Sequence, residues 1–281
     1  METAGRESAQ ELALNMEFVH YLLVKFIADE ITNTGFNKGV IGVSGGVDSA
    51  VSASLTAEAL GKENTIGILM PYKTSSPKSV EDALALIEKL GITHQVLDIS
   101  PMVDAYCDQH DVKDPMRIGN IMARMRMILL YDISAREKAL VIGTSNKTEL
   151  MVGYGTLFGD TASAINPLGD LYKTQVWQLA EALGVPEGII KKHPTADLWE
   201  GQTDEGEIGI SYSILDKILY QIVDERRIDE EIKEAGCDMT VVSKIRRMIQ
   251  TSQFKRRMPL IAKVSYRTIN VDFRYVRDWG I

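Results

Sequence analysis

The fold is decided at Gly39-Val40-Ile41-Gly42-Val43-Ser44-Gly45-Gly46-Val47-Asp48-Ser49, where a short apolar run leads into a glycine-rich turn. An apolar run of this length, bounded by turn residues, is typical of a strand that is buried on both faces. The residues from Ala50 to Leu60 then predict a helix that ends at Gly61. The Ser-Gly-Gly turn therefore lies where a buried strand ends and a helix begins.

The same alternation of strand and helix continues on both sides of this stretch. Further strands are expected at 65–70, 94–99 and 139–143, and further helices at 11–31, 79–90 and 120–136. Strands that alternate with helices predict an α/β fold, in which a parallel twisted sheet carries helices on both faces. Such a sheet binds ligands at the carboxyl ends of its strands.

The chain beyond Thr144 has a mostly helical pattern. Helices are expected at 173–183, 211–224, 228–235 and 239–250, while the glycines and acidic residues of 198–208 predict a mobile loop. Because no linker, repeat or low-complexity tract divides the sequence, we expect a single α/β domain over residues 1–281 with a helical C-terminal part.

The composition is that of a water-soluble globular protein, with 45% hydrophobic and 25% charged residues. No segment approaches the roughly 20 apolar residues that span a bilayer, so no membrane partner is expected. Residues 1–10 lack the basic start and apolar core of a secretory signal, which favours a cytoplasmic location. Cys107 and Cys237 lie far apart and indicate neither a disulfide framework nor a thiolate metal site.

The net charge of −8 argues against a nucleic-acid partner, because a phosphate backbone repels an acidic protein unless basic residues cluster on one face. One basic stretch does occur near the C-terminus, at Lys244, Arg246, Arg247 and 255–257. It suits an anionic ligand, and a solvated helix face explains it equally well.

The glycine-rich turn at 44–49 has the chemistry of a phosphate-binding loop. A turn between a strand and a helix can direct consecutive backbone N–H groups at a phosphate, and the N-terminus of the helix adds positive partial charge. The lysine of the Gly-x-x-x-x-Gly-Lys-Ser/Thr loop is absent here, and no Gly-x-Gly-x-x-Gly follows the strand. The one carboxylate, Asp48, suits a magnesium ion that bridges phosphate oxygens.

Ser44-Gly45-Gly46-Val47-Asp48-Ser49 resembles the signature of the pyrophosphate-loop ATPases. The resemblance implies an adenine nucleotide alpha hydrolase-like, Rossmann-like fold. In such enzymes the loop grips the leaving pyrophosphate while a substrate oxygen attacks the α-phosphate of ATP. The motif indicates this adenylation chemistry and leaves the substrate open.

Three later stretches, Gly143–Glu149, Tyr154–Val176 and Pro194–Glu205, resemble elements of the ammonia-dependent NAD synthetases in their order along the chain. Without the resemblance, Glu149 would serve a helix dipole, Lys173 would be an exposed first-turn residue and Thr195 would belong to a polar loop that excludes water.

The resemblance implies an AMP-producing ligase that joins ammonia to nicotinic acid adenine dinucleotide (deamido-NAD) and so makes NAD. ATP is then expected at Gly42, Val43, Ser44, Gly45, Gly46, Val47, Asp48, Ser49, Thr144, Lys173 and Thr195. Magnesium is expected at Asp48 and Glu149, and the catalytic residues are expected to be Asp48, Glu149 and Lys173. The resemblance also implies a homodimer, in which the opening and terminal helices pack across a two-fold axis.

Deamido-NAD is expected at Arg124 and Lys255, and at three positions where the sequence departs from the family pattern. Many members carry a lysine where Leu157 stands, an aspartate where Ala164 stands and a histidine where Phe254 stands. The nucleotide side of the expected site therefore follows the family more closely than the dinucleotide side.

Two other functions compete with this interpretation. A pyrophosphate-loop enzyme that modifies tRNA would carry a large basic surface and often catalytic cysteines, whereas this chain is acidic and its cysteines are isolated. A nucleotide-binding regulator without turnover would account for the three departures, and the presence of Asp48 and Glu149 argues against it.

Overall fold

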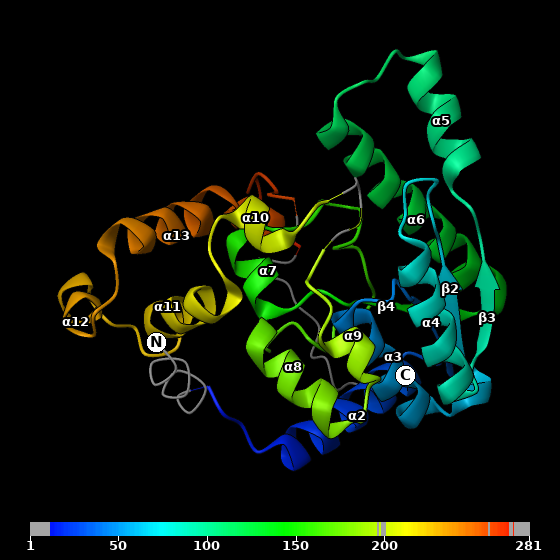
Figure 1. The fold of residues 1–281 in the computed structure, drawn as a ribbon, viewed down its shortest axis with the longest axis horizontal. Helices are drawn as coiled ribbons and strands as arrows, with labels where there is room; N and C mark the ends of the chain where they lie inside the picture. The colour runs from blue at the N-terminus through cyan, green and yellow to red at the C-terminus, as the bar shows by residue number, and fades with distance from the viewer. Residues whose placement is uncertain (1–11, 196, 198–200, 258, 270–271, 273–281) are drawn as a thin grey trace.

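The computed structural model describes residues 12–195, 197, 201–257, 259–269 and 272 (Figure 1). Its centre is a parallel sheet with the strand order β3-β2-β1-β4. The strands are β1 (Lys38–Gly42), β2 (Thr65–Leu69), β3 (Thr93–Val96) and β4 (Ala139–Ile142). Because β1 pairs with β4, these two strands end side by side at the same edge of the sheet. The expected parallel α/β architecture is confirmed.

Both faces of the sheet are covered, which explains why β1 is an unbroken apolar run. Val40 packs with Ile68 and Val141 in a cluster that includes residues of α6 (Pro115–Glu137). The next residue, Ile41, belongs to the core on the opposite face. That core is closed by α2 (Met16–Thr32), α3 (Val47–Leu60), α4 (Pro77–Leu90) and α8 (Lys173–Ala182). Side chains alternate across a strand, so a strand between two helical layers is apolar at every position.

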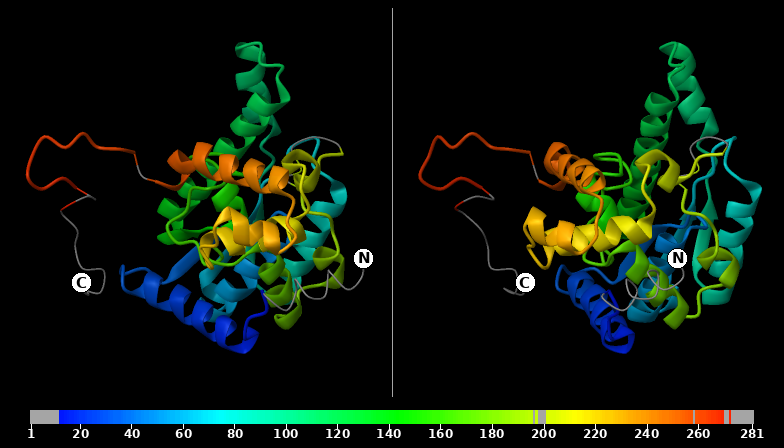
Figure 2. Two further views of the ribbon diagram at one scale, coloured as in Figure 1. Left: turned by 90° about the vertical axis from the view of Figure 1, so that its left-hand side faces the viewer. Right: turned by 60° about the vertical axis from the view of Figure 1, so that its left-hand side comes forward.

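Between β3 and β4 the structure has one helix that the sequence analysis missed and a second that begins earlier than expected. The missed helix is α5 (Ser100–Gln109), which follows β3. The other is α6, which begins at Pro115 because Asp114 caps it by accepting hydrogen bonds from the N–H groups of Met116 and Arg117. Helix α5 and the N-terminal part of α6 project together from the rest of the molecule (Figure 2), while the remainder of α6 packs against β1 and β4.

The chain beyond β4 is helical, as expected. It forms α7 (Lys147–Val152), α8, α9 (Glu187–Ile190), α10 (Asp204–Ile208), α11 (Tyr212–Val223), α12 (Asp229–Glu234) and α13 (Met239–Thr251). The prediction of a mobile loop over 198–208 is wrong for its last five residues, because Thr203 caps α10 by accepting a hydrogen bond from Gly206. Residues 198–200 of that loop lie outside the described residues. None of the described helices has the length and apolar character that crossing a membrane would require.

One buried carboxylate, that of Asp216 on α11, links the first turns of α7 and α8. Its Oδ1 accepts a hydrogen bond from Thr148 Oγ1 at 2.5 Å, and its Oδ2 accepts one from the Thr174 N–H at 2.8 Å. Thr148 Oγ1 in turn accepts a hydrogen bond from the Lys173 N–H at 3.0 Å. Asp216 is fully buried, and burial raises its pKa to about 6. This carboxylate therefore fixes α7 against α8, although the two helices are separated in sequence.

We expect Asp216 to make the stability of the wild-type protein fall as the pH rises from about 4 to about 7. Its folded pKa of about 6 exceeds its ordinary value of 3.8, so the folded state holds the proton more tightly. The resulting stabilisation is complete below the lower value and is lost as the pH rises through the higher one. Asp216→Asn cannot ionise. Its amide oxygen can accept from the Thr174 N–H as the carboxylate does, and its NH2 group would donate to Thr148 Oγ1, which reverses the direction of that hydrogen bond.

The measurement is the free energy of unfolding in urea for wild type and Asp216→Asn at both pH values. Between pH 4 and pH 7 the wild type should lose up to about 3 kcal/mol relative to the variant, because one pKa unit corresponds to about 1.4 kcal/mol. Equal pH dependence in the two proteins would contradict the assignment.

Candidate active site

A cavity of about 300 Å³ opens at the carboxyl ends of β1 and β4, where the strand-to-helix turns were expected to bind a ligand. Most of the predicted nucleotide-site residues line it. These are Gly42, Val43, Ser44, Gly46, Val47, Asp48, Ser49, Thr144, Glu149, Lys173 and Thr195. The tertiary structure thus gathers segments that lie more than 150 residues apart in the sequence.

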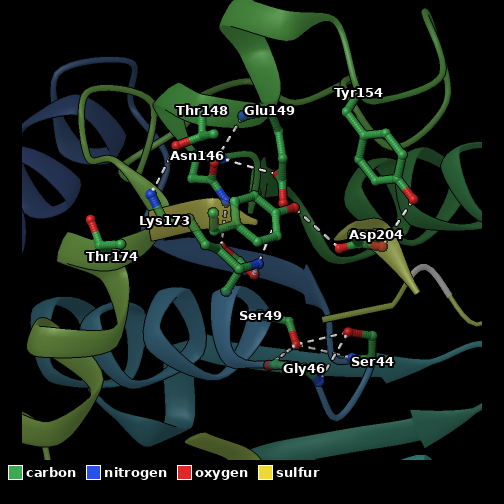
Figure 3. A network of polar contacts seen from close by, with 12 residues as sticks. Ser44, Gly46, Ser49, Asn146, Thr148, Glu149, Tyr154, Lys173, Thr174 and Asp204 are labelled. Atoms are coloured by element: carbon green, nitrogen blue, oxygen red, sulfur yellow. Dashed lines mark hydrogen bonds and ion pairs between the residues drawn. The ribbon is translucent and has the colours of Figure 1, made fainter. Parts of the chain in front are cut away.

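The turn between β1 and α3 is closed by its own serines (Figure 3). Ser49 Oγ accepts a hydrogen bond from the Ser44 N–H at 3.2 Å and donates one to the Gly46 carbonyl at 3.0 Å. Gly45 has φ +75°, and a Cβ there would lie 2.1 Å from the carbonyl oxygen of Ser79. In the described structure no side chain caps the N-terminus of α3. A rigid turn with free amides at the start of a helix is suited to bind an anion.

The ammonium group of Lys173 lies between two carboxylates at the mouth of this turn (Figure 3). Its Nζ is 2.5 Å from Asp48 Oδ2 and 3.5 Å from Glu149 Oε1. Asn146 Nδ2 donates to Asp48 Oδ1 at 2.8 Å, and the Asn146 side chain also caps α7. The Lys173 side chain is only 2% exposed, so its interpretation as an exposed first-turn residue is wrong.

Burial sets the ionisation of this cluster. Burial raises the pKa of Glu149 to about 8, and the negative charge of Asp48 adds to that shift. Burial opposes the charge of Lys173 as well, but Asp48 and Glu149 outweigh it and raise its pKa, so the ammonium stays charged. Burial also raises the pKa of the nearby Asp204. Three carboxylates around one ammonium leave the cluster short of positive charge, and a cation would stabilise it.

The donors in this cluster match a magnesium ion better than a transition metal. No group of three or more His, Cys, Asp or Glu side chains with the spacing of a metal site occurs among the residues the structure describes. Asp48 and Glu149 offer hard carboxylate oxygens, and both carboxylates contact the Lys173 ammonium, so they lie close to each other. Magnesium is commonly bound by one or two carboxylates, with phosphate oxygens of the substrate and water as its other ligands.

Several side chains of the cavity were missed by the sequence analysis. Tyr154 and Asp204 both line it, and the Tyr154 hydroxyl lies 2.9 Å from Asp204 Oδ1. The Tyr212 hydroxyl is 3.3 Å from the other oxygen of Asp204. Burial raises the pKa of both tyrosines, so they remain neutral hydrogen-bond donors. The sequence analysis also missed Asn146, which contacts Asp48 beside the cavity. The spacing Asn-x-x-Glu could have identified it as the residue that caps a helix, since this is the pattern of a capping box.

Arg124 and Arg126 have different surroundings on α6. Arg126 lines the cavity and donates from Nε to the Met70 carbonyl at 3.0 Å. Arg124 is exposed and donates to the Leu157 carbonyl at 3.2 Å. Residues two apart on a helix point in different directions, so only one of the pair can enter the cavity.

The other residues expected on the dinucleotide side do not line this cavity. Lys255 Nζ donates to the carbonyls of Gly153 and Gly155 at 2.8 and 2.7 Å. Arg124 and Lys255 thus both hold the segment 153–157, of which Tyr154 and Thr156 line the cavity. Phe254 is 62% exposed. Ala164 extends the edge of β4 by donating its N–H to the Val141 carbonyl at 2.9 Å.

Solved structures share this architecture. An ammonia-dependent NAD synthetase from Campylobacter jejuni, solved with a nitrate ion, matches with a TM-score of 0.77 and 35% identity, over 89% of this chain and 100% of that one. An NMN synthetase from Francisella tularensis matches with a TM-score of 0.80 and 34% identity, over 89% of this chain and 99% of that one.

The sequence matches agree with the structural ones. An ammonia-dependent NAD synthetase of Trichlorobacter lovleyi is 55% identical over 96% of this chain and 98% of its own length. One from Chlorobium phaeobacteroides (strain BS1) is 52% identical over 97% of this chain and 98% of its own length. The model of the NAD synthase family matches residues 19–259. The chain therefore belongs to the NAD synthase family.

Proposed function

We propose that this protein catalyses the ATP-dependent amidation of nicotinic acid adenine dinucleotide by ammonia, which yields NAD, AMP and pyrophosphate. Relatives that are 52% and 55% identical over nearly the whole chain are named for this reaction. The observation that carries the proposal is the Lys173 ammonium between Asp48 and Glu149, beside the serine-closed turn at 44–49. This arrangement suits a nucleotide whose α-phosphate is attacked.

In the first step, a carboxylate oxygen of the substrate attacks the α-phosphorus of ATP, and the bond to the bridging oxygen of pyrophosphate breaks. Ammonia then attacks the activated acyl carbon, loses a proton and displaces AMP. The substrates supply both nucleophiles, so the protein contributes positioning and charge neutralisation. The amides at the start of α3 hold phosphate oxygens, Lys173 neutralises charge as it develops, and Thr144 and Thr195 line the same cavity.

We propose Asp48 and Glu149 as the residues that hold magnesium. When bound, the ion neutralises phosphate charge and polarises the phosphorus–oxygen bonds. The support is the proximity of the two carboxylates, which contact the same ammonium group, and the excess of negative charge around Lys173.

The dinucleotide side of the proposed site is built around the segment 153–157. Arg124 and Lys255, which both hold this segment, are the proposed contacts for the substrate's phosphates. Leu157, Ala164 and Phe254 are the remaining positions proposed to face the dinucleotide, and none of them carries charge.

A second candidate substrate is the mononucleotide whose amidation gives NMN. Two observations support it: the NMN synthetase matches with a TM-score of 0.80, compared with 0.77 for the Campylobacter enzyme, and three uncharged residues stand on the dinucleotide side.

The expected products separate these possibilities. Purified protein with ATP, magnesium and ammonium should convert deamido-NAD into NAD with one AMP for each NAD, as measured by chromatography. The kcat/KM for deamido-NAD should exceed that for nicotinic acid mononucleotide at least tenfold. The reverse order would assign the mononucleotide, and release of ADP in place of AMP would contradict adenylation.

The metal roles predict the effect of removing each carboxylate charge. Asp48→Asn and Glu149→Gln should each lower kcat at least tenfold. Each variant would hold magnesium less tightly, and the negative charge of the transition state is then neutralised less well. Asp170→Asn is the matched control, since Asp170 is 96% exposed and lies outside the cavity. Circular dichroism checks the fold of all three variants. Wild-type activity in Asp48→Asn and Glu149→Gln would remove these residues from the site.

We also propose that two chains associate through their opening and terminal helices. The support is a row of exposed apolar side chains at the start of the described chain, Leu14, Phe18, Tyr21 and Leu22, which are 42–64% exposed. Sedimentation equilibrium should give twice the chain mass of 31.2 kDa, and Phe18→Asp should lower it to that of one chain. A wild-type mass of one chain would contradict the dimer.

The cytoplasmic location stays a prediction.

A further inference from the structure

Lys192, two residues after α9 (Glu187–Ile190), reaches the phosphate-binding turn and has no role in the function proposed above. Its Nζ donates to Ser79 Oγ at 2.7 Å and lies 3.5 Å from the carbonyl oxygen of Gly45. Its side chain lines the cavity. A second ammonium group therefore lies beside the turn at 44–49, brought there by a segment different from the one that carries Lys173.

The charges of the two lysines are balanced differently. Lys173 contacts the carboxylates of Asp48 and Glu149 directly. Lys192 makes no ion pair with a carboxylate within the described residues, and its two hydrogen-bond partners are a hydroxyl and a carbonyl oxygen, which are neutral. The positive charge of Lys192 therefore remains available to an anion in the cavity, while that of Lys173 is already neutralised in part.

The position of Lys192 relative to the turn suggests which anion it would bind. Gly45 is packed against the first turn of α4, because a Cβ at Gly45 would lie 2.1 Å from the Ser79 carbonyl oxygen. This packing brings the turn, the start of α4 and Lys192 to one point of the cavity wall. A phosphate bound at the turn would come within reach of the Lys192 ammonium, which can exchange the Ser79 hydroxyl for a charged acceptor with a gain in hydrogen-bond strength.

We propose that Lys192 is a further catalytic residue, whose ammonium binds the terminal phosphates of ATP and stabilises the pyrophosphate that leaves. When the bond between the α-phosphorus and the bridging oxygen breaks, its electron pair stays with pyrophosphate. Lys192 neutralises that added negative charge, and Lys173 acts at the carboxylate cluster. The inference rests on the proposed function, because it names the residue that holds the leaving group of that reaction.

A purely structural role is the competing explanation, in which Lys192 only fastens the segment after α9 to α4 through Ser79. The two explanations differ for Ser79→Ala, which removes the fastening hydrogen bond and leaves the charge of Lys192 in place. If Lys192 only fastens the segment, Ser79→Ala and Lys192→Met should have the same effect. If it binds phosphate, only the loss of the ammonium group should matter.

The experiment is calorimetric titration of the full-length protein with magnesium pyrophosphate, without the other substrates. Lys192→Met should weaken pyrophosphate binding at least tenfold, and Lys192→Arg should retain part of it. Lys191→Met is the matched control, because Lys191 is 74% exposed and pairs with Glu187 at the surface. Lys191→Met and Ser79→Ala should both bind pyrophosphate within about threefold of wild type.

Pyrophosphate binding by Lys192→Met within twofold of wild type would overturn the proposal, as would a loss in Ser79→Ala equal to that in Lys192→Met. Thermal unfolding shows whether Lys192→Met is folded, and if it is not, the comparison of Ser79→Ala with wild type still decides. Because the titration needs no turnover, a wild-type protein that binds pyrophosphate but makes no NAD would reject the proposed function alone.

Discussion

The candidate site depends on the ion cluster of Lys173, Asp48 and Glu149. An ammonium group that is 2% exposed is tolerated only if carboxylates replace its lost hydration, and here two carboxylates do so. Asp48 stands in the first turn of α3, Glu149 in that of α7, and Lys173 begins α8. One cluster of charges therefore holds the first turns of three helices at the mouth of the cavity, and the remaining parts of the site are arranged around it.

The parallel sheet makes this cluster geometrically possible. Neighbouring parallel strands end at the same edge, so the turn after β1 and the turn after β4 meet although about 100 residues separate them. Asn146 then connects the turns by donating to Asp48 while it caps α7. On the far side, Asp216 holds Thr148 and Thr174, the neighbours of Glu149 and Lys173. The helical C-terminal part thus fixes the positions of Glu149 and Lys173 through their neighbours in the chain.

The cavity has a definite distribution of charge. Its carboxylates surround Lys173, where burial raises the pKa of Glu149 and of Asp204, and a divalent cation would relieve the excess negative charge. Arg126 and Lys192 contribute positive charge from other directions, and both donate to neutral oxygens. A site that has a cluster of carboxylates able to bind a cation, and separate basic groups, is suited to a magnesium-bound polyphosphate. That chemistry agrees with the membership of the chain in the NAD synthase family.

The sequence by itself determined the alternation of strands and helices, the phosphate-binding turn and the resemblance that led to the family. These features depend on neighbouring residues: β1 is an apolar run, and α3 and α4 end at Gly61 and Gly91 as expected. Only the tertiary structure decided that Lys173 is buried, that Arg126 lines the cavity in place of Arg124, and that Asp204 and Lys192 reach it. Helix α5 was missed as well, and only the folded structure revealed it. The physical reason is that burial, ion pairing and access to a cavity depend on segments that are distant in the sequence, and no local pattern of residues encodes which of them will meet.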